Sequence, residues 1–521
     1  MISAARWSAI LLLFCCAFAA SAADRAPLER DTAVIAPLVL RELDQGRFGL
    51  GHMLWPERSV NLPLTNSLLF QVPSMGPVRA ALAREFDGYV EHHKASLPNE
   101  SIGVGDGFAF HLFDRTLLDS PDVRFVLAGI VNRMDRAYVA PESCGEVRLI
   151  YRLTRTDAPP VGENAVSQRL PMTLNLVLKA KGDHARDRDG KEITCRELAR
   201  RWLAIGAPSA GERMLDILFG KDGPLDLIAP ENIRSIETNL QIAHAPKSAT
   251  RDFRTDYLMK VFDYKRETKQ FEETPLENQI DPERLLSDGG LARDFKAWLL
   301  DPKNFEALDR GTILVPDRFL KKSVVAPTPV GFAPSNLQPA FGLVAGEDGG
   351  KDPLFAESDV VAALEKAARS GTKLQNIRSV AGFERRLNDM TCSGCHQTRG
   401  IGGFHFPGVD WMAARPSNST VVPASPHFFG DQVRRRDILT AFATGKQPDF
   451  SRGFASRPQE RGSTELAGTE YEDGWGSHCY VQSAKRSEND KSFSAWTCAE
   501  GLACQAGGPT TRMGMCFVKT R

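Results

Sequence analysis

Five short segments in the first half of the chain constrain the fold more than any other feature of the sequence. They cover residues 125–131, 145–153, 172–178, 236–243 and 257–264. The first is a continuous apolar run, and in the second and third apolar side chains alternate with polar ones, as in strands with one buried face. Helical segments at 195–205 and 212–219 separate the third strand from the fourth. This order favours a mostly antiparallel α+β domain over a doubly wound one.

A long helix is predicted before these strands. It opens at Gly76-Pro77, because proline is tolerated in a first turn, where its missing N–H costs nothing. Its buried stripe recurs every three to four residues and comprises Val78, Leu82, Phe86, Tyr89 and His93. His92 and His93 come at its end, where a helix C-terminus favours positive charge. We interpret them as capping residues rather than as a metal-binding pair.

The N-terminus has the pattern of a secretory signal peptide. Arg6 precedes an apolar core at 10–18, and Ala20-Ser21-Ala22-Ala23 offers small residues for cleavage. We therefore expect residues 1–23 to be removed and the mature protein to be periplasmic or secreted. No later segment is apolar over the ~18 residues that a membrane span needs. Lys plus Arg and Asp plus Glu number 65 each, a balance that gives no argument for binding nucleic acid.

The cysteines sort by position into separate groups. Cys15 and Cys16 lie in the signal peptide, and Cys392 and Cys395 belong to one short motif. The others predict three disulfides in an oxidising compartment. They are Cys144, Cys195, Cys479, Cys498, Cys504 and Cys516. Cys144 pairs with Cys195 if the last four close among themselves, which leaves three connectivities for those four.

The short motif is Cys392-Ser393-Gly394-Cys395-His396, a C-x-x-C-H site. This spacing is the attachment pattern of a c-type haem. The two thiols add to the vinyl groups of the porphyrin, and the adjacent His396 supplies the proximal nitrogen to the iron. An amphipathic helix with an apolar stripe at Ile377, Val380, Phe383, Leu387 and Met390 leads directly into the motif.

Two other interpretations of the motif remain open. One is a structural disulfide with an incidental histidine, and the other is half of a metal site completed by a pair such as His405 and His427. Thiol redox enzymes place C-x-x-C at a helix N-terminus, whereas here the apolar stripe precedes the motif. A structural zinc site brings a second ligand pair at defined spacing, which the sequence lacks. Haem attachment is therefore the favoured interpretation.

The distal ligand of such a haem is less constrained. His405 is the first choice, because it lies between Phe404 and Phe406 in a Gly-rich loop soon after the motif. The alternatives are Met412, His427, Met134 and His52. A thioether ligand would raise the reduction potential relative to a second histidine, and an open position would favour ligand binding or peroxide chemistry.

A second group of charged residues lies at the end of the first strand and on one face of the second. It comprises Arg133, Asp135, Glu146 and Arg148. Such residues can bind an anionic ligand. No metal-ligand or phosphate-loop spacing accompanies them, so we favour a solvated strand face whose charges pair across the sheet.

Three motifs together resemble a group of uncharacterised exported bacterial proteins with a single, c-type cytochrome-like C-x-x-C-H site. They are Asn132-Arg133-Met134-Asp135, Cys144-Gly145-Glu146-Val147-Arg148 and Thr391-Cys392-Ser393-Gly394-Cys395-His396. In that group an aromatic residue often stands where this chain has Met134 and Val147. The resemblance covers about residues 122–400 and implies a shared architecture and a haem or redox site. It brings no established reaction, and only the C-x-x-C-H positions carry a function over.

The sequence thus predicts an α+β protein with a large, mostly antiparallel N-terminal domain, a helical haem-bearing segment and a small disulfide-rich C-terminal module. The expected parts are a signal peptide at 1–23, an α+β domain at 24–315, a Pro/Gly-rich linker or surface crossing at 316–353, a c-type haem segment at 354–455 and a Cys-rich module at 470–521.

The expected function is that of an exported protein with one covalent haem c, held by Cys392, Cys395 and His396. It would act in electron transfer or redox chemistry with a redox partner protein. Whether it is a carrier or a single-haem enzyme stays open, as does its oligomeric state; a di-haem peroxidase would need a second C-x-x-C-H. The alternative is a non-haem exported surface or interaction protein in which Cys392–Cys395 is a structural disulfide.

Overall fold

The computed structural model describes residues 32–57, 64–102, 115–156, 169–187, 189–205, 214–220, 222–246, 254–327, 354–393, 408–412, 426–453, 478–480, 497–498, 501–506 and 513–518. The predicted signal peptide lies outside the described residues. So do Cys395, His396 and His405 of the predicted haem site.

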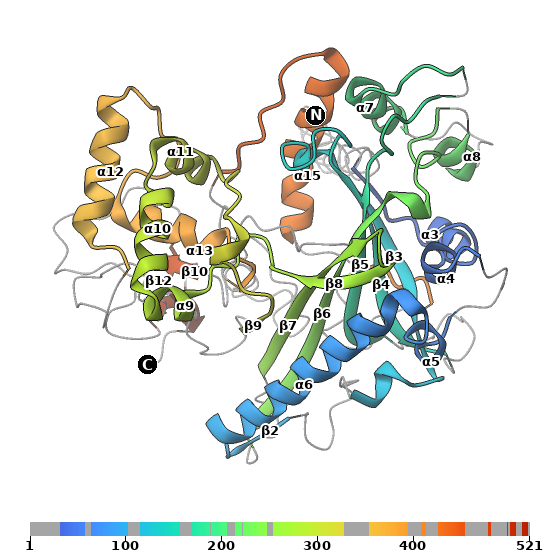
Figure 1. Cartoon of the computed structure of the whole chain (residues 1–521), viewed down its shortest axis with the longest axis horizontal. Helices are drawn as coiled ribbons and strands as arrows, with labels where there is room; N and C mark the ends of the chain where they lie inside the picture. Colours follow the sequence, from blue (N-terminus) through green and yellow to red (C-terminus); the bar gives the residue numbers. More distant parts are fainter. Residues whose placement is uncertain are drawn as a thin grey trace, which may run out of the picture.

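A nine-stranded antiparallel sheet forms the centre of the molecule (Figure 1). Its main path runs β1-β3-β4-β5-β6-β7-β8, while β2 pairs with β6 and β9 with β7. The strands are β1 (Ala33–Val34), β2 (Glu100–Ile102), β3 (Val123–Arg133), β4 (Glu146–Arg155), β5 (Arg169–Lys179), β6 (Ile233–Pro246), β7 (Arg254–Lys265), β8 (Gln270–Thr274) and β9 (Val324–Pro327). The five predicted strands are β3 to β7, so the mostly antiparallel α+β fold is confirmed.

One face of the sheet, here termed the α6 face, is covered by helix α6 (Gly76–Ser96). Figure 1 shows α6 running across the sheet with its C-terminal end beside β2. The predicted stripe, from Val78 to His93, is buried. It packs on inward-facing side chains such as Leu149, Leu176 and Leu240 in the main hydrophobic core. Three short helices close the same core: α3 (Pro37–Asp44), α4 (Leu50–Leu54) and α5 (Asn66–Leu69).

The opposite face of the sheet carries charged side chains and is termed the charged face. Arg148 on β4 is opposite Val177 on β5, and Asn175 is opposite Glu237 on β6. Glu237 is in turn opposite Val261 on β7. Because side chains alternate strictly along a strand, Glu146, Arg148, Glu237 and Met259 all project from this face.

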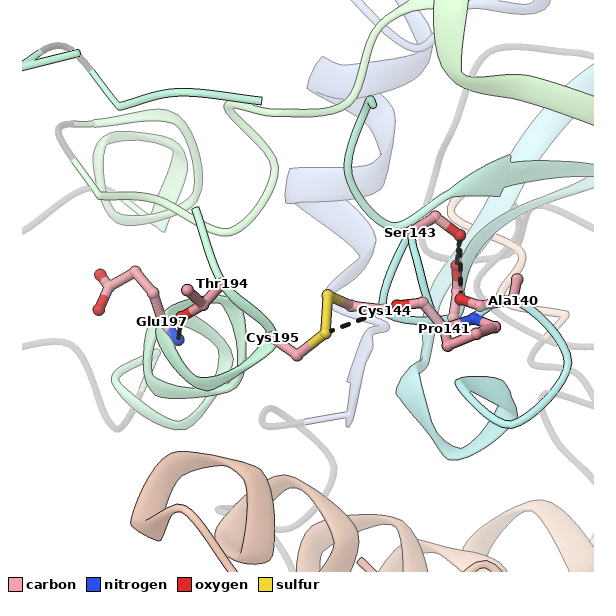
Figure 2. The surroundings of a disulfide bond; sticks show 8 residues. Ala140, Pro141, Ser143, Cys144, Thr194, Cys195 and Glu197 are labelled. Carbon is pink, nitrogen blue, oxygen red and sulfur yellow. Dashed lines mark hydrogen bonds between the residues drawn. A yellow bond between two sulfur atoms is a disulfide. The ribbon is translucent and has the colours of Figure 1, made fainter. Parts of the chain in front are cut away.

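A disulfide joins the start of β4 to helix α7 (Cys195–Leu203) (Figure 2). It links Cys144 to Cys195, which confirms the predicted pair. The N-terminus of α7 is capped by Thr194, whose side chain accepts a hydrogen bond from the backbone N–H of Glu197. Helix α8 (Met214–Phe219) follows, and α15 (Pro426–Thr444) packs against α7.

A second hydrophobic core is built mainly from helices. Its helices are α9 (Pro282–Ser287), α10 (Gly289–Leu299), α11 (Pro302–Arg310), α12 (Glu357–Arg369) and α13 (Val380–Asp389). Phe295, Phe355 and Phe383 meet edge to face at its centre. Local sequence starts these helices, since Asp281-Pro282 and Asp301-Pro302 each place a capping carboxylate before a first-turn proline.

The packing of the helices can be compared with the expected domain boundaries. Helices α9 to α11 fall inside the expected 24–315 domain, yet they pack with α12 and α13 rather than on the α6 face. The expected linker at 316–353 begins with ordered structure, because β9 pairs with β7 in the sheet. Residues 328–353 lie outside the described part.

The C-terminal module contains a three-stranded antiparallel sheet. Its strands are β10 (His478–Tyr480), β11 (Leu502–Ala506) and β12 (Met513–Val518). Cys498 and Cys504 are each disulfide-bonded. Among the described residues, no helix has the length and apolar character to cross a membrane.

Candidate functional site

Helix α13 leads into the cysteine motif, and a buried carboxylate binds the segment just before that helix. Asp309, at the end of α11, accepts backbone N–H bonds from Gln375, Asn376 and Ile377 at 2.6–2.7 Å. Phe383 and Leu387 then anchor α13 in the helical core. The approach to the motif is thus set by the packing of α11 and α13.

Cys392 lies between the helical core and the sheet. It is 5% exposed, and it packs with Met259 of β7, Leu276 and Ala326 of β9. After the end of α13 the chain bends at Thr391, and Cys392 and Ser393 resume helical conformation. The motif thus follows the end of α13, as the sequence predicted, and its first two residues are helical.

Residues 277–279 hold this part of the motif. The Sγ of Cys392 lies 3.8 Å from the carbonyl oxygen of Glu277. The backbone N–H of Ser393 donates to Oε1 of Gln279 at 3.1 Å, and Nε2 of Gln279 donates to the Ser393 hydroxyl at 3.2 Å. Between them, Asn278 has a left-handed φ of 58° and binds Ile313 and Val315 through its side chain.

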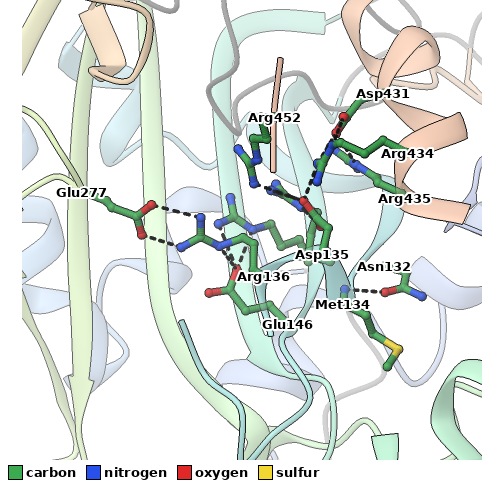
Figure 3. Close-up of polar contacts among 12 residues, drawn as sticks. Asn132, Met134, Asp135, Arg136, Glu146, Glu277, Asp431, Arg434, Arg435 and Arg452 are labelled. Atoms are coloured by element: carbon green, nitrogen blue, oxygen red, sulfur yellow. Dashed lines mark hydrogen bonds and ion pairs between the residues drawn. The ribbon is translucent and has the colours of Figure 1, made fainter. Parts of the chain in front are cut away.

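Glu277, itself exposed, also connects the motif to a mostly buried group of charged residues, here termed the arginine cluster (Figure 3). The carboxylate of Glu277 accepts hydrogen bonds from both terminal nitrogens of Arg136. Arg136 in turn donates to Glu146 at 3.1 Å. The cluster comprises Arg133, Arg136, Arg148, Arg434, Arg435 and Arg452 with Asp135, Glu146, Glu237, Glu277 and Asp431.

Asp135 is the central carboxylate of this cluster. Its side chain is fully buried and binds Arg133 at 2.8 Å, Arg434 at 2.9 Å and Arg452 at 3.2 Å. These partners come from β3, from α15 and from the segment after α15. The expectation of a solvated strand face was therefore wrong: Glu146 and Arg148 are 3% and 4% exposed, because α15 and residues 277–279 cover the charged face.

The electrostatics of the cluster favour negative charge. Among the described residues, its arginines outnumber its carboxylates. Burial, followed by the charge of Arg133, lowers the pKa of Arg435 to about 10. Burial also lowers the pKa of Arg452. Although burial opposes it, neighbouring carboxylates raise the pKa values of Arg133, Arg136 and Arg434. Only Arg435 and Arg452 thus carry a buried positive charge that their neighbours offset in part, the condition that an anionic group would relieve.

None of the described candidate ligands Met134, His52 and Met412 belongs to the cluster around Cys392. Met134 is part of the main hydrophobic core, and His52 is exposed near the opposite end of the chain. Met412 follows Trp411, whose indole N–H donates to the Leu127 carbonyl at 2.9 Å. His405 lies outside the described residues, and of His427 only the backbone is described, in α15.

Several residues around Cys392 were not found by sequence reasoning. Glu277 and Gln279 lie more than 110 positions before the motif in a stretch without a local pattern, and they reach it only in the fold. Asp431, Arg434 and Arg435 could have been noticed as a charged turn of a helix, but such a turn is usually solvent-facing. Comparison of the chain with protein-family models, curated proteins and solved structures gives no match.

Proposed function

We propose that this is an exported redox protein with one covalent haem c, attached through Cys392 and Cys395, with His396 as the proximal ligand. The observation that carries the proposal is a C-x-x-C-H motif whose first cysteine is buried in an apolar cluster next to a buried, arginine-rich cluster. The haem would supply a one-electron couple, and nearby arginines would raise its potential because positive charge favours the reduced form.

The surroundings of Cys392 fit this group in two respects. Met259, Leu276 and Ala326 give Cys392 the apolar setting that suits a thioether sulfur beside a macrocycle. Haem also carries two propionates, and guanidinium groups are the usual partners of buried carboxylates. Arg136, which shares Glu277 with Cys392, belongs to the cluster that would offset this negative charge.

Covalent haem content tests the proposal. The full chain is produced in a bacterial host with haem-maturation machinery, and haem is detected in denaturing gels and by a Soret band. We expect about one haem per wild-type chain and none in Cys392→Ala/Cys395→Ala. Ser393→Ala is the matched control, since it changes the motif region but keeps C-x-x-C-H. Equal haem in wild type and the double variant would overturn the proposal.

Two follow-up measurements distinguish an enzyme from an electron carrier, and a haem protein from one with a structural disulfide. Adding carbon monoxide to the reduced haem protein shifts the Soret band if the iron has an open position, as in an enzyme, and leaves it unchanged in a six-coordinate electron carrier. If wild type carries no haem, thiol labelling before and after reduction detects Cys392 and Cys395 as a disulfide, which supports the interaction-protein alternative.

A further inference from the structure

A second group of potential ligands lies on the α6 face, on the other side of the sheet from Cys392. It consists of His93 on α6, Glu100 on β2 and His244 on β6. One ligand atom from each lies within 4.8 Å of the others. Among the described residues, neither the haem motif nor the arginine cluster contributes to this group, so it stands apart from the function proposed above.

Strand register brings the three residues together. Ile102 of β2 is opposite His244 of β6, so Glu100, two residues earlier, projects from the same face and lies diagonal to His244. On the other side of β6, Ile242 is opposite Asp256 of β7, which places Asp256 on this face as well. Helix α6 crosses here, and its buried stripe ends with Tyr89 and His93, one turn apart.

The contacts define an ordered set of polar groups. The Nδ1 of His244 lies 2.5 Å from a carboxylate oxygen of Glu100, and the Nε2 of His93 lies 3.9 Å from the same oxygen. The Nε2 of His244 faces Asp256 at 3.4 Å, and the Tyr89 hydroxyl donates to Asp256 at 2.8 Å. The imidazoles of His93 and His244 meet edge to face, with centroids 4.9 Å apart.

His93 is the unusual member. It is 4% exposed, and neither ring nitrogen has a hydrogen-bond partner among the described residues. A buried polar group without a partner is costly and rare in native proteins. Among the described residues its imidazole therefore bonds no carbonyl at the end of α6, and a metal ion would supply the missing partner. The interpretation of His93 as a helix-capping residue is therefore wrong.

We propose that His93, Glu100 and His244 bind a divalent first-row transition-metal ion. Two imidazole nitrogens and a carboxylate oxygen form a common protein donor set for zinc and its neighbours. His244 would bind through Nδ1, because its Nε2 faces Asp256. Asp256, itself held by Tyr89, then completes a carboxylate–histidine–metal arrangement that fixes the ring and its tautomer.

Zinc retention tests the site on untagged protein, because a histidine tag would bind zinc itself. The mature chain is stripped with a chelator, loaded with zinc, freed of excess by gel filtration and assayed for zinc and iron separately, so that any haem iron is not counted. We expect one zinc per wild-type chain and none in His93→Gln/His244→Gln. His92→Gln is the control, since His92 is exposed one position away on the same helix.

Further measurements distinguish a folding defect from loss of the metal site. Zinc should raise the thermal midpoint of wild type and of His92→Gln but not of the double variant. Asp256→Asn, which leaves all three ligands in place, should weaken zinc binding by about tenfold or more. If stripped wild type with a native circular dichroism spectrum retains no more zinc than the double variant, the proposal is wrong.

Discussion

At the scale of single residues, the arginine cluster shows why a buried charge is tolerated. Asp135 has no exposed side-chain surface and is bound by three guanidinium groups. Burial alone would raise its pKa, but Arg133 and the other arginines outweigh this and lower the pKa well below its ordinary range. The carboxylate therefore stays charged, and its partners depend on that charge.

Asp135→Asn should destabilise the protein by about 3–5 kcal/mol, because it leaves buried arginines without their counter-charge. The matched control is Asp119→Asn. Asp119 pairs with Arg79 at 2.6 Å, but both side chains are about half exposed, and exposed pairs contribute about 1 kcal/mol or less. Urea unfolding of both variants, at an unchanged m value, checks the difference. Similar losses in the two would contradict the central role of Asp135.

At the scale of elements, the turn before β4 sets the position of this strand, which carries Glu146 and Arg148. Cys144 and Gly145 have left-handed φ values of 58° and 91°, and this turn brings the disulfide and Glu146 to the start of β4. A Cβ on Gly145 would lie 2.6 Å from the carbonyl oxygen of Arg133. The turn thus packs directly on the end of β3, beside Asp135.

Gly145→Ala should cost more than about 2 kcal/mol, because it combines an unfavourable φ with a backbone clash. Gly190→Ala is the control without the clash. Gly190 also has a left-handed φ, 79°, but a Cβ at this position would lie in open space. Its expected cost is about 1 kcal/mol. Thermal unfolding under identical conditions compares the two variants, and an equal shift in Tm would show that the contact with Arg133 is unimportant.

How far sequence could predict these elements depends on how local the signal is. Strands β3 to β7 and the buried stripe of α6 could be predicted from the sequence, because alternation and helical periodicity are local properties. Strand β2 is only three residues long, and its Glu100 meets His244 across 144 positions. Likewise Asp135 is covered by Arg434 from 299 positions away, so its burial had no local signal. The motif cysteines could be found, but their neighbours Glu277 and Gln279 could not.

At the scale of the whole molecule, the arginine cluster joins the sheet to the helical core. Arg452 donates to Asp135 with its side chain, and its backbone is bound by Arg386 of α13 and by Arg310 of α11. Glu277 adds a second connection through Arg136. The two hydrophobic cores are therefore held together by ion pairs, of which Arg452–Asp135 is buried, as well as by the apolar contacts of Cys392.

This arrangement predicts a loss of stability in acid. Burial would raise the pKa of Glu146, but Arg136, Arg148 and Arg234 outweigh it and lower the pKa to about 2. Since the folded pKa lies below the ordinary value of 4.5, the contribution of Glu146 is complete above about pH 4.5 and is lost as the pH falls towards 2. The pKa values of Asp135 and Asp431 are lowered in the same direction.

The free energy of unfolding, measured in urea from pH 6 to pH 3, should therefore fall steeply for wild type. Glu146→Gln removes one of these titrating groups, so it should be less stable at pH 6 and show a shallower decrease towards pH 3, by an amount on the order of a few kcal/mol. Parallel curves for wild type and Glu146→Gln would show that this carboxylate is not held ionised in the fold.

The position of the Cys144–Cys195 disulfide has a consequence for biogenesis. No other cysteine lies between these two, which are 51 residues apart. In a chain that emerges N-terminus first into an oxidising compartment, Cys195 is the next thiol to appear after Cys144. The native pair can then form by sequential oxidation, without disulfide rearrangement, and both thiols are consumed before Cys392 and Cys395 emerge. For an exported chain, as proposed above, this order of cysteines would keep the C-x-x-C-H thiols from mispairing with them.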